Sequence, residues 1–429
     1  MAMLAPQFRL RPASVVPVRF FILALVGFVA FGLALALDPR AMALPPGAGG
    51  ILLLHLCVLG WITPAMMGAN YQLTPVLLGR SLPASRLPTV IFWLYAAGVW
   101  VFLAGWALRR PAWVALGGAV AGCALLGFAA HIAAVRLRGR GGGSVGGGPV
   151  GVGLGGGVAF LAVVAVLGPW LALAHNHLVS APGVLPWMHA GAGLAGWFGL
   201  TIMGAGYQLA PFFAATPKEG GRGTAWTALA LVGGGALWLL VAPAAVAPDL
   251  PGALAVWAGL ALWGIDILRI VHRGRQAHRE PAAWSVAAAA AALWLGASAA
   301  VVAIAGLASP GLALAGAFLG IMAGPSLLIV GQLQKILPFM AALDASVSAK
   351  RQGRVPKTEA LFPRGRGFAL LGLLGSGCAL TAIGLGVPAW GLVRLGAALL
   401  AVGALGVAVA QAVVVRAWYR AGANAAEPR

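Results

Sequence analysis

Charged residues, and acidic residues above all, are scarce in this chain of 429 residues. Asp and Glu number 8 against 28 Lys and Arg, and charged residues make up 8% of the sequence, whereas about 25% is usual for soluble globular proteins. A water-soluble globular fold is therefore excluded. The apolar fraction of 61% and the mean hydropathy of +0.95 indicate a protein that spans a membrane several times.

The net charge of +20 could suggest a nucleic-acid partner. The basic residues, however, lie mainly in short segments between apolar runs, where membrane topology accounts for them. We therefore expect contact with membrane lipid and none with nucleic acid.

Cysteine is rare as well. Cys57, Cys123 and Cys378 lie inside apolar runs and form no CxxC or CxxH pattern, which excludes a disulfide framework and a cysteine zinc site. We expect all three to act as small buried hydrophobic residues. P-loop, HExxH, nucleophile-elbow and catalytic-triad spacings are also missing, so the sequence predicts none of the enzyme classes that these motifs mark.

Long apolar runs dominate the sequence. A membrane-spanning helix needs about 20 apolar residues, and the chain has twelve such runs. The first follows Arg9, Arg11 and Arg19 in the manner of a signal peptide, but its apolar part is long for one, so we retain it as a helix. The twelve predicted helices cover residues 17–37, 50–75, 88–108, 112–135, 152–174, 187–213, 224–246, 252–271, 283–307, 310–338, 368–389 and 391–415.

The basic residues orient these helices. All but four of the 28 Lys and Arg residues fall on the side that holds the N-terminus, the exceptions being Arg40, Arg109, Arg110 and Arg394. Because cytoplasmic segments are enriched in basic residues, we expect both termini in the cytoplasm and the protein in the cell inner membrane. The second, sixth and tenth predicted helices then all enter from the outer side.

One motif organises the chain by occurring three times. Its first copy, residues 55–78, contains Gly60-Trp61 and Gly68, followed by a Tyr-Gln-x-x-Pro segment that begins at Tyr71. A second copy lies at residues 189–213 with the same spacing from Gly-Trp onward, and a more divergent third copy lies at residues 316–339. The matching positions are Gly196-Trp197, Gly204 and Tyr207-Gln208-Leu209-Ala210-Pro211 in the second copy, and Gly331 and Gln334-Lys335-Ile336-Leu337-Pro338 in the third.

The motif falls on the second helix of each group of four, which predicts three repeated units. We therefore expect an all-α integral membrane protein with helices 1–4 in residues 1–138, helices 5–8 in residues 152–281 and helices 9–12 in residues 282–429. Residues 139–151 are a glycine-rich linker, flexible because glycine leaves the backbone free. Residues 341–366 are a basic cytoplasmic loop, expected to face lipid headgroups.

The Tyr-Gln-x-x-Pro segment closes each copy of the motif at the inner end of its helix. Proline removes a backbone N–H and frees a carbonyl within the membrane, so Pro75, Pro211 and Pro338 predict a need for nearby polar groups. Two interpretations stay open: a lining for a polar or ion path, and a helix end anchored at the membrane interface. The polar groups in question are Tyr71, Gln72, Tyr207, Gln208, Gln334 and Lys335.

Histidine supplies the candidate metal ligands. His55 and His189 lie near the outer ends of two motif helices, and an intramembrane histidine is costly unless it is paired, metal-bound or facing a cavity. A hydrogen-bonded core histidine and an iron ligand both fit this placement. His175 and His177 follow the fifth predicted helix, where we expect them to cap or line a loop, with metal binding as the alternative.

The other histidines carry no expected chemistry. His131 ends the fourth predicted helix beside Arg136 and Arg138, and we expect it to face lipid headgroups. His272 and His278 belong to a basic loop.

Asp266 is the only acidic residue within a predicted helix. Arg269 lies three residues further along the same helical face, so a local ion pair is one interpretation and a proton relay is the other.

These features resemble the catalytic subunits of heme-copper oxidases and nitric oxide reductases, which have twelve helices in three four-helix units and a histidine at the outer end of helix 2. Two segments carry the closest resemblance, to proteins like subunit I of cbb3-type cytochrome oxidases. One holds His55, Gly60-Trp61, Gly68 and Tyr71-Gln72-Leu73 with Pro75; the other is Gln334-Lys335-Ile336-Leu337-Pro338-Phe339. The resemblance implies that His55 binds a low-spin heme and that His189 stands where the family has a metal ligand on helix 6.

The sequence departs from that family at its copper centre. The predicted helices 7 and 10 contain no histidine, although both carry metal ligands in the family, and Gly193 stands where the family has its cofactor tyrosine. Copper and terminal-oxidase activity are therefore not expected. The resemblance implies a b-type heme on His55, with His189, His175 or His177 as second ligand. Electron transfer, sensing or respiratory-complex assembly would follow, with a respiratory-chain membrane subunit or a cytochrome as partner.

Two other functions remain open. One is a membrane transporter or channel built from the same repeats, with the Tyr-Gln-Pro segments as polar break points. The other is a cofactor-free accessory subunit that packs against another membrane protein. A heme absorption band in the purified protein would separate the first hypothesis from both.

Overall fold

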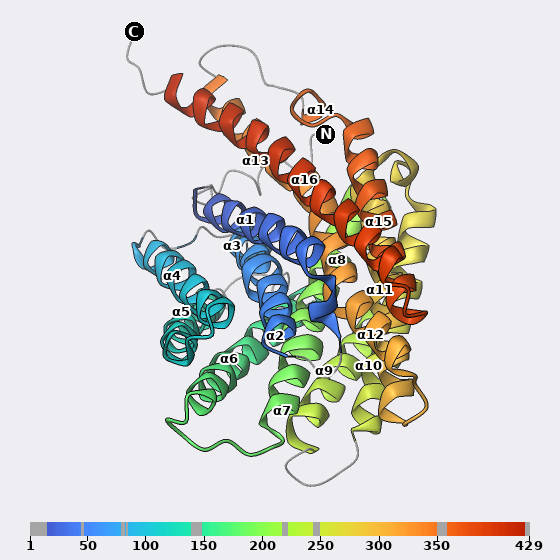
Figure 1. Cartoon of the computed structure of the whole chain (residues 1–429). Helices are drawn as coiled ribbons and strands as arrows, with labels where there is room; N and C mark the ends of the chain where they lie inside the picture. Colours follow the sequence, from blue (N-terminus) through green and yellow to red (C-terminus); the bar gives the residue numbers. More distant parts are fainter. Residues whose placement is uncertain are drawn as a thin grey trace.

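Helices make up every regular element of the described residues in the computed structural model of the protein (Figure 1). Those residues are 15–43, 47–78, 82, 85–138, 148–216, 222–242, 249–349 and 358–424. Long apolar segments become helices because a backbone in lipid must satisfy its hydrogen bonds within its own segment or a closed barrel. The expected all-α architecture is confirmed.

The helices follow one another along the chain with short connections. In order they are α1 (Val15–Leu37), η3 (Pro39–Met42), α2 (Ala48–His55), η4 (Leu56–Ile62), α3 (Thr63–Leu78), α4 (Leu87–Ala107), α5 (Pro111–Arg138), α6 (Pro149–His175), α7 (Leu185–Gly191), η7 (Ala192–Leu200), α8 (Thr201–Ala214), α9 (Arg222–Val241), α10 (Leu250–Arg273), η9 (Ala277–Arg279), α11 (Pro281–Ile304), α12 (Pro310–Ala317), η10 (Phe318–Ala323), α13 (Gly324–Ala349), α14 (Thr358–Leu361), α15 (Arg364–Gly386) and α16 (Trp390–Asn424).

Eleven helices in the described part are long and apolar enough to cross a membrane, and each coincides with one of the twelve predicted runs. The protein is therefore an integral membrane protein with many transmembrane helices. The remaining run, predicted at 187–213, is helical without a break over 185–214, as α7, η7 and α8. It is not among the eleven, since glycines and the polar Tyr207-Gln208 pair lower its apolar content.

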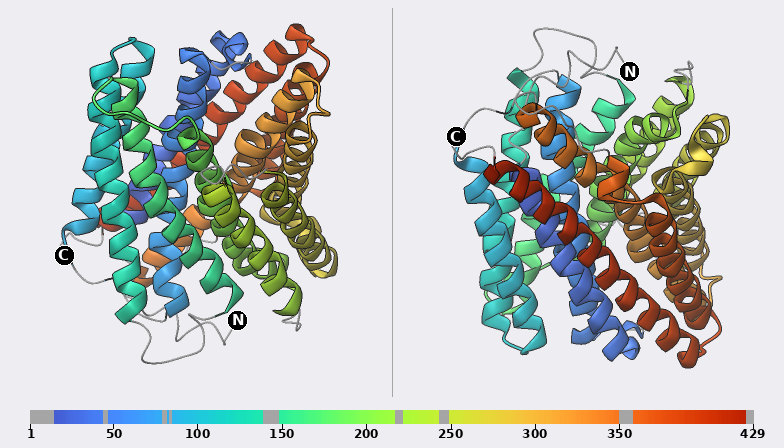
Figure 2. Two further views of the ribbon diagram at one scale, coloured as in Figure 1. Left: turned by 90° about the horizontal axis from the view of Figure 1, so that it is seen from below. Right: turned by 90° about the horizontal axis from the view of Figure 1, so that it is seen from above.

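The helices pack in a pattern that recurs three times. α4 packs on α5, α9 on α10 and α15 on α16; in the same way α5 packs on α6, α10 on α11, and α16 returns to α1 (Figures 1 and 2). The last contact is close, because a Cβ added to Gly32 of α1 would lie 2.9 Å from the Cα of Ala401 in α16. The chain thus closes on itself as a ring of helices.

Each motif helix contains a short π-helical segment. These segments are η4, η7 and η10, and π-helix is rare in proteins and frequent at functional sites. Relative to the motif glycines Gly68, Gly204 and Gly331, η4 and η7 begin twelve residues earlier and η10 thirteen residues earlier. The three copies of the motif therefore share a backbone irregularity as well as a sequence pattern.

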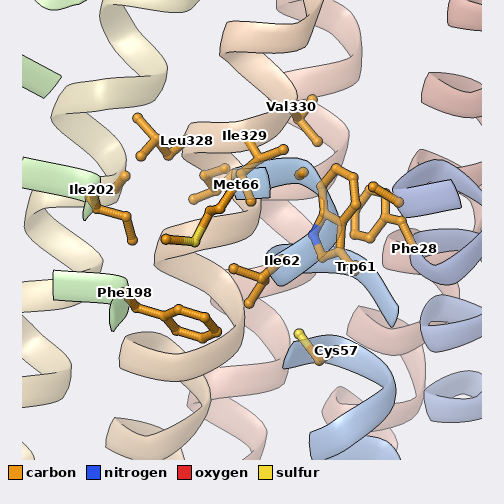
Figure 3. Packing of buried hydrophobic residues seen from close by; sticks show 14 of the residues in the cluster. Phe28, Cys57, Trp61, Ile62, Met66, Phe198, Ile202, Leu328, Ile329 and Val330 are labelled. Carbon is orange, nitrogen blue, oxygen red and sulfur yellow. The ribbon is translucent and has the colours of Figure 1, made fainter. Parts of the chain in front are cut away.

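The motif helices meet at the centre of the bundle (Figure 3). Met66, Ile202 and Ile329 each stand two residues before their motif glycine, and all three are buried there. This apolar centre separates the two ends of the motif helices. We call the end with His55 and His189 the histidine end, and the opposite end, with the Tyr-Gln-x-x-Pro segments, the polar end.

Three expectations about connections need correction. Pro75, Pro211 and Pro338 lie inside helices, so none of them is itself a helix end. α3 and α8 stop within a turn of their prolines, but α13 continues to Ala349, because residues 341–349 are rich in alanine and proline at one position removes only one hydrogen bond. Residues 341–349 are therefore helix, not loop.

The predicted linker is also shorter than expected at its C-terminal end. Residues 149–151 form the first turn of α6, where Pro149 suits the first helical position. Residues 139–147 of the linker and residues 350–357 of the predicted cytoplasmic loop lie outside the described residues.

Candidate functional site

The motif glycines allow the first helix of each unit to approach its motif helix. A Cβ on Gly68 would lie 3.1 Å from the carbonyl oxygen of Pro17 in α1, and a Cβ on Gly204 would lie 2.9 Å from the backbone nitrogen of Leu154 in α6. A Cβ on Gly331 would overlap Ser285 in α11. In all three copies the glycine is needed for close helix packing, and the Tyr-Gln positions that follow are left to carry the polar contacts.

At the polar end of the first copy, Tyr71 pairs with a histidine. The Tyr71 hydroxyl oxygen lies 3.4 Å from Nδ1 of His131, and both side chains are buried. The expectation that His131 faces headgroups is wrong, because this face of α5 is turned toward α3. Phe128, one helical turn earlier, packs edge-on against the same tyrosine ring. An aromatic residue and a histidine at i and i+3 on an apolar face were the sequence signal for this contact.

In the second copy, Tyr207 pairs with the intramembrane acid. Its hydroxyl donates to Oδ2 of Asp266 at 3.1 Å, and Arg269 lies 3.7 Å from Oδ1 of the same carboxylate. The predicted ion pair is confirmed, whereas the tyrosine partner was not foreseen. Asp266 lies on α10 and His131 on α5, the fourth long helix of the second and first units respectively.

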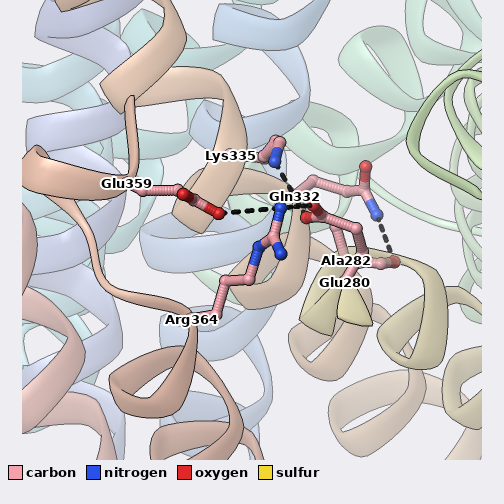
Figure 4. Close-up of polar contacts among 6 residues, drawn as sticks. All are labelled: Glu280, Ala282, Gln332, Lys335, Glu359 and Arg364. Carbon is pink, nitrogen blue, oxygen red and sulfur yellow. Dashed lines mark hydrogen bonds and ion pairs between the residues drawn. The ribbon is translucent and has the colours of Figure 1, made fainter. Parts of the chain in front are cut away.

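In the third copy, Lys335 takes the position of the glutamine and forms a buried ion pair (Figure 4). Its Nζ donates to Oε2 of Glu280 at 2.8 Å, and Arg364 donates to Oε1 of the same carboxylate at 3.1 Å. Arg364 also reaches Glu359 at 2.7 Å. The Glu280 side chain is only 3% exposed, so its charge depends on the two cations.

The remaining polar residues of the motif take less part in hydrogen bonding. Gln72 is half-buried, and its side-chain oxygen has no hydrogen-bond partner among the described residues. Gln208 is half-buried, while Gln334 is buried and lines a pocket with Lys335. The polar end thus joins each motif helix to another helix through at least one polar pair.

At the histidine end, His55 is the last residue of α2 and His189 lies in the last turn of α7. His55 Nδ1–H donates to the carbonyl oxygen of Ile51 at 2.9 Å, which leaves Nε2 as the nitrogen with a lone pair. His189 lies against Gly168, whose Cβ, if present, would be 3.2 Å from the ring. The buried Nδ1 of His189 has no partner in the described part of the chain.

A row of aromatic rings connects His55 to His175. The His55 ring packs edge-on against Phe102, with centroids 5.2 Å apart, and Phe102 contacts Trp106. The Trp106 ring lies 4.6 Å from that of His175 at the end of α6. His175 and His177 are exposed, so they lie at a loop, as predicted.

Metal-binding clusters of three or more His, Cys, Asp or Glu side chains are not found in the described ranges. A heme needs fewer ligands, since one or two axial residues hold its iron. All three cysteines are free; Cys57 and Cys378 are buried as expected, but Cys123 is exposed on α5. The exposed His272 and His278 lie away from the histidine end, at the connection between α10 and α11.

Comparison with known proteins adds no identification: no protein-family model and no curated protein matches this sequence.

Proposed function

We propose that the protein is a heme-copper-oxidase-like protein of the inner membrane that binds one b-type heme and has no copper centre or terminal-oxidase activity. Its role would be electron transfer, sensing or respiratory-complex assembly beside a respiratory-chain membrane subunit. The observation that supports this best is that each of the two motif-helix histidines keeps a ring nitrogen free: Nε2 in His55, whose Nδ1 is hydrogen-bonded to Ile51, and the buried Nδ1 in His189, which has no partner among the described residues. Two intramembrane histidines at one depth are costly without a shared use.

The two side chains are suited to heme iron in different ways. His55 is held by the Ile51 carbonyl with Nε2 left free, which is the usual arrangement of a metal-binding histidine. His189 has a buried nitrogen with no partner in the described residues. Phe102 packs against His55 and Trp106 packs against Phe102, so the surroundings of His55 are aromatic. A bound heme would supply one-electron redox chemistry.

An absorption spectrum of the purified, reduced protein tests this proposal. We expect a Soret band in the wild type, its loss in His55→Ala, and its alteration or loss in His189→Ala. His272→Ala and His278→Ala should keep the wild-type spectrum, because both histidines are exposed and belong to the α10–α11 connection. A wild type without heme, under conditions that load other b-type cytochromes, would contradict the proposal.

The proposed fold has twelve membrane-spanning helices in three four-helix units, with both termini cytoplasmic. The recurring neighbour pattern, the matching π-helical segments and the equivalent glycine contacts support units related by rotation about the membrane normal. α1 and α16 pack side by side and run in opposite directions (Figure 1), which suits an even number of crossings. An alkaline-phosphatase fusion at the C-terminus should be inactive; full periplasmic activity would contradict this topology.

The polar end favours a second candidate, a transporter built from the same repeats. Tyr71–His131, Tyr207–Asp266 and Lys335–Glu280 put polar groups at one end of all three motif helices. Flux through proteoliposomes that is lost in Tyr71→Phe and Lys335→Met, in a protein without a heme spectrum, would favour transport over redox function.

A further inference from the structure

A small pocket lies at the polar end of the third motif helix, where α11, α13, α14 and α15 meet. It is partly open to the outside. Its polar lining consists of Glu280, Gln334, Lys335, Thr358, Glu359 and Arg364, four of which Figure 4 shows as an ion-pair network. The heme proposal does not use this pocket, and the transport proposal uses only its Lys335–Glu280 pair.

Glycine makes the close meeting of these helices possible. A Cβ on Gly367, in the first turn of α15, would lie 2.7 Å from Oε1 of Gln334 and 2.8 Å from Cγ of Pro281. Gly331 on α13 likewise admits Ser285 of α11. The pocket is therefore a product of tight helix packing around Gln334.

Gln334 is the unusual member of the lining. Its residue is 6% exposed, and neither its side-chain nitrogen nor its oxygen has a hydrogen-bond partner among the described residues. A buried amide without hydrogen-bond partners destabilises the fold. Because Gln334 lines the pocket, a ligand in the pocket can supply the missing partners.

The free groups of the pocket favour an anion. Both oxygens of Glu280 already accept, one from Lys335 and one from Arg364. The groups left over are mainly donors: Nε2 of Gln334, the buried Nε of Arg364 and the remaining protons of the Lys335 ammonium. Oε1 of Gln334 is the one unpartnered buried acceptor among the lining residues that the structure describes.

Helix ends add positive potential to this donor excess. α11 begins at Pro281 and α15 begins at Arg364, so the N-termini of two long helices adjoin the pocket, and each carries a partial positive charge. The formal charges of Glu280, Glu359, Lys335 and Arg364 cancel. The helix ends therefore leave the site net positive.

We propose that this pocket binds a phosphate group, supplied either by a phospholipid headgroup or by a soluble phosphate compound. Phosphate offers several acceptor oxygens to Gln334, Arg364 and Lys335. A cation is disfavoured because both oxygens of the buried Glu280 carboxylate are already paired with the cationic side chains Lys335 and Arg364. The site would be independent of any heme at the histidine end.

The test compares Gln334→Leu with Gln411→Leu in the full-length purified protein. Gln411 in α16 is a matched control, since it is fully buried with both amide atoms unpartnered among the described residues, yet it does not line the pocket. One arm delipidates the protein and measures rebinding of phosphatidylglycerol by native mass spectrometry. The other measures the thermal shift caused by inorganic phosphate in detergent.

We expect Gln334→Leu to weaken binding about tenfold to a hundredfold in one arm, and Gln411→Leu to bind like the wild type. Rebinding of phosphatidylglycerol without a thermal shift in inorganic phosphate identifies a lipid headgroup as the ligand. A thermal shift in inorganic phosphate without rebinding of phosphatidylglycerol identifies a soluble phosphate compound. Gln334→Glu, which keeps the side-chain shape and adds a negative charge, should also lose binding, and serves if Gln334→Leu does not fold. Equal binding by wild type and both Gln334 variants, or no binding by the wild type in either arm, overturns the proposal.

Discussion

The indole N–H of Trp61 donates to the hydroxyl of Ser326 at 2.9 Å, and so joins the first motif helix to the third. A second bond of the same kind joins the second motif helix to the first, from Trp197 to Oγ1 of Thr63 at 3.4 Å. Trp61 and Trp197 stand seven residues before their motif glycines, and Thr63 and Ser326 stand five residues before theirs. The two bonds therefore join equivalent positions of different motif copies.

The third pair of positions has glycine in place of both partners. Gly324 stands at the tryptophan position of the third copy, and Gly199 stands at the acceptor position of the second. The two bonds fit the proposed arrangement of three units related by rotation about a central axis.

We predict that Ser326→Ala destabilises the protein by about 1 kcal/mol, because the buried indole N–H of Trp61 loses its acceptor. The measurement is thermal unfolding in detergent. Ser298→Ala is the control, since Ser298 accepts from Trp257 in a half-buried pair where water or lipid headgroups can substitute. A larger loss for Ser298→Ala than for Ser326→Ala would contradict the role given to this contact.

The Tyr71–His131 contact should show as coupling between two substitutions. Tyr71→Phe and His131→Phe are each expected to cost about 1 kcal/mol, because each leaves a buried polar atom unpaired. The double variant should cost less than the sum of the two. Additive losses of stability would show that the hydroxyl and the imidazole do not interact.

Gly331 should tolerate no larger side chain. Gly331→Val is expected to lower stability by about 3 kcal/mol or more, or to abolish expression, because even a Cβ at this position overlaps Ser285. Gly372→Val is the matched control in α15, where a Cβ has open space around it. Retained expression and thermal stability of Gly331→Val would contradict the close approach of α11 and α13.

Removing a cationic side chain should lower stability far more at the buried Glu280 network than at the exposed Asp266–Arg269 pair. Lys335→Met is expected to cost about 2–4 kcal/mol, because it leaves buried Glu280 with Arg364 alone. Arg269→Met should cost less than about 1 kcal/mol, since the Arg269 side chain is 63% exposed. Similar losses in the two variants, measured by thermal unfolding in the same detergent, would contradict the importance of burial at Glu280.

The sequence predicted the helices well because the rule that governs them is local. An apolar run of sufficient length must be helical in lipid, and the repeated motif marked which helices meet. The π-helical segments could not be foreseen, since nothing in Leu56–Ile62 differs in composition from ordinary helix. They depend on how three helices pack at the centre.

The polar partners of the motif residues were harder to predict from the sequence than the helices. Tyr71, Tyr207 and Lys335 were expected to need polar neighbours, but His131 and Glu280 were not recognised as those neighbours. Both stand near the ends of predicted helices, close to arginine or proline in the sequence, where a solvent-facing role is the ordinary interpretation. Only the packing of α5 on α3 and of α11 on α13 turns them inward.

The contact between α1 and α16 has a consequence for biogenesis. Synthesis proceeds from the N-terminus, so α1 is made well before its packing partner α16. Until α16 is inserted, the face of α1 around Gly32 lacks this neighbour. Closure of the ring of helices therefore waits for the synthesis of α16, however early the intervening helices fold.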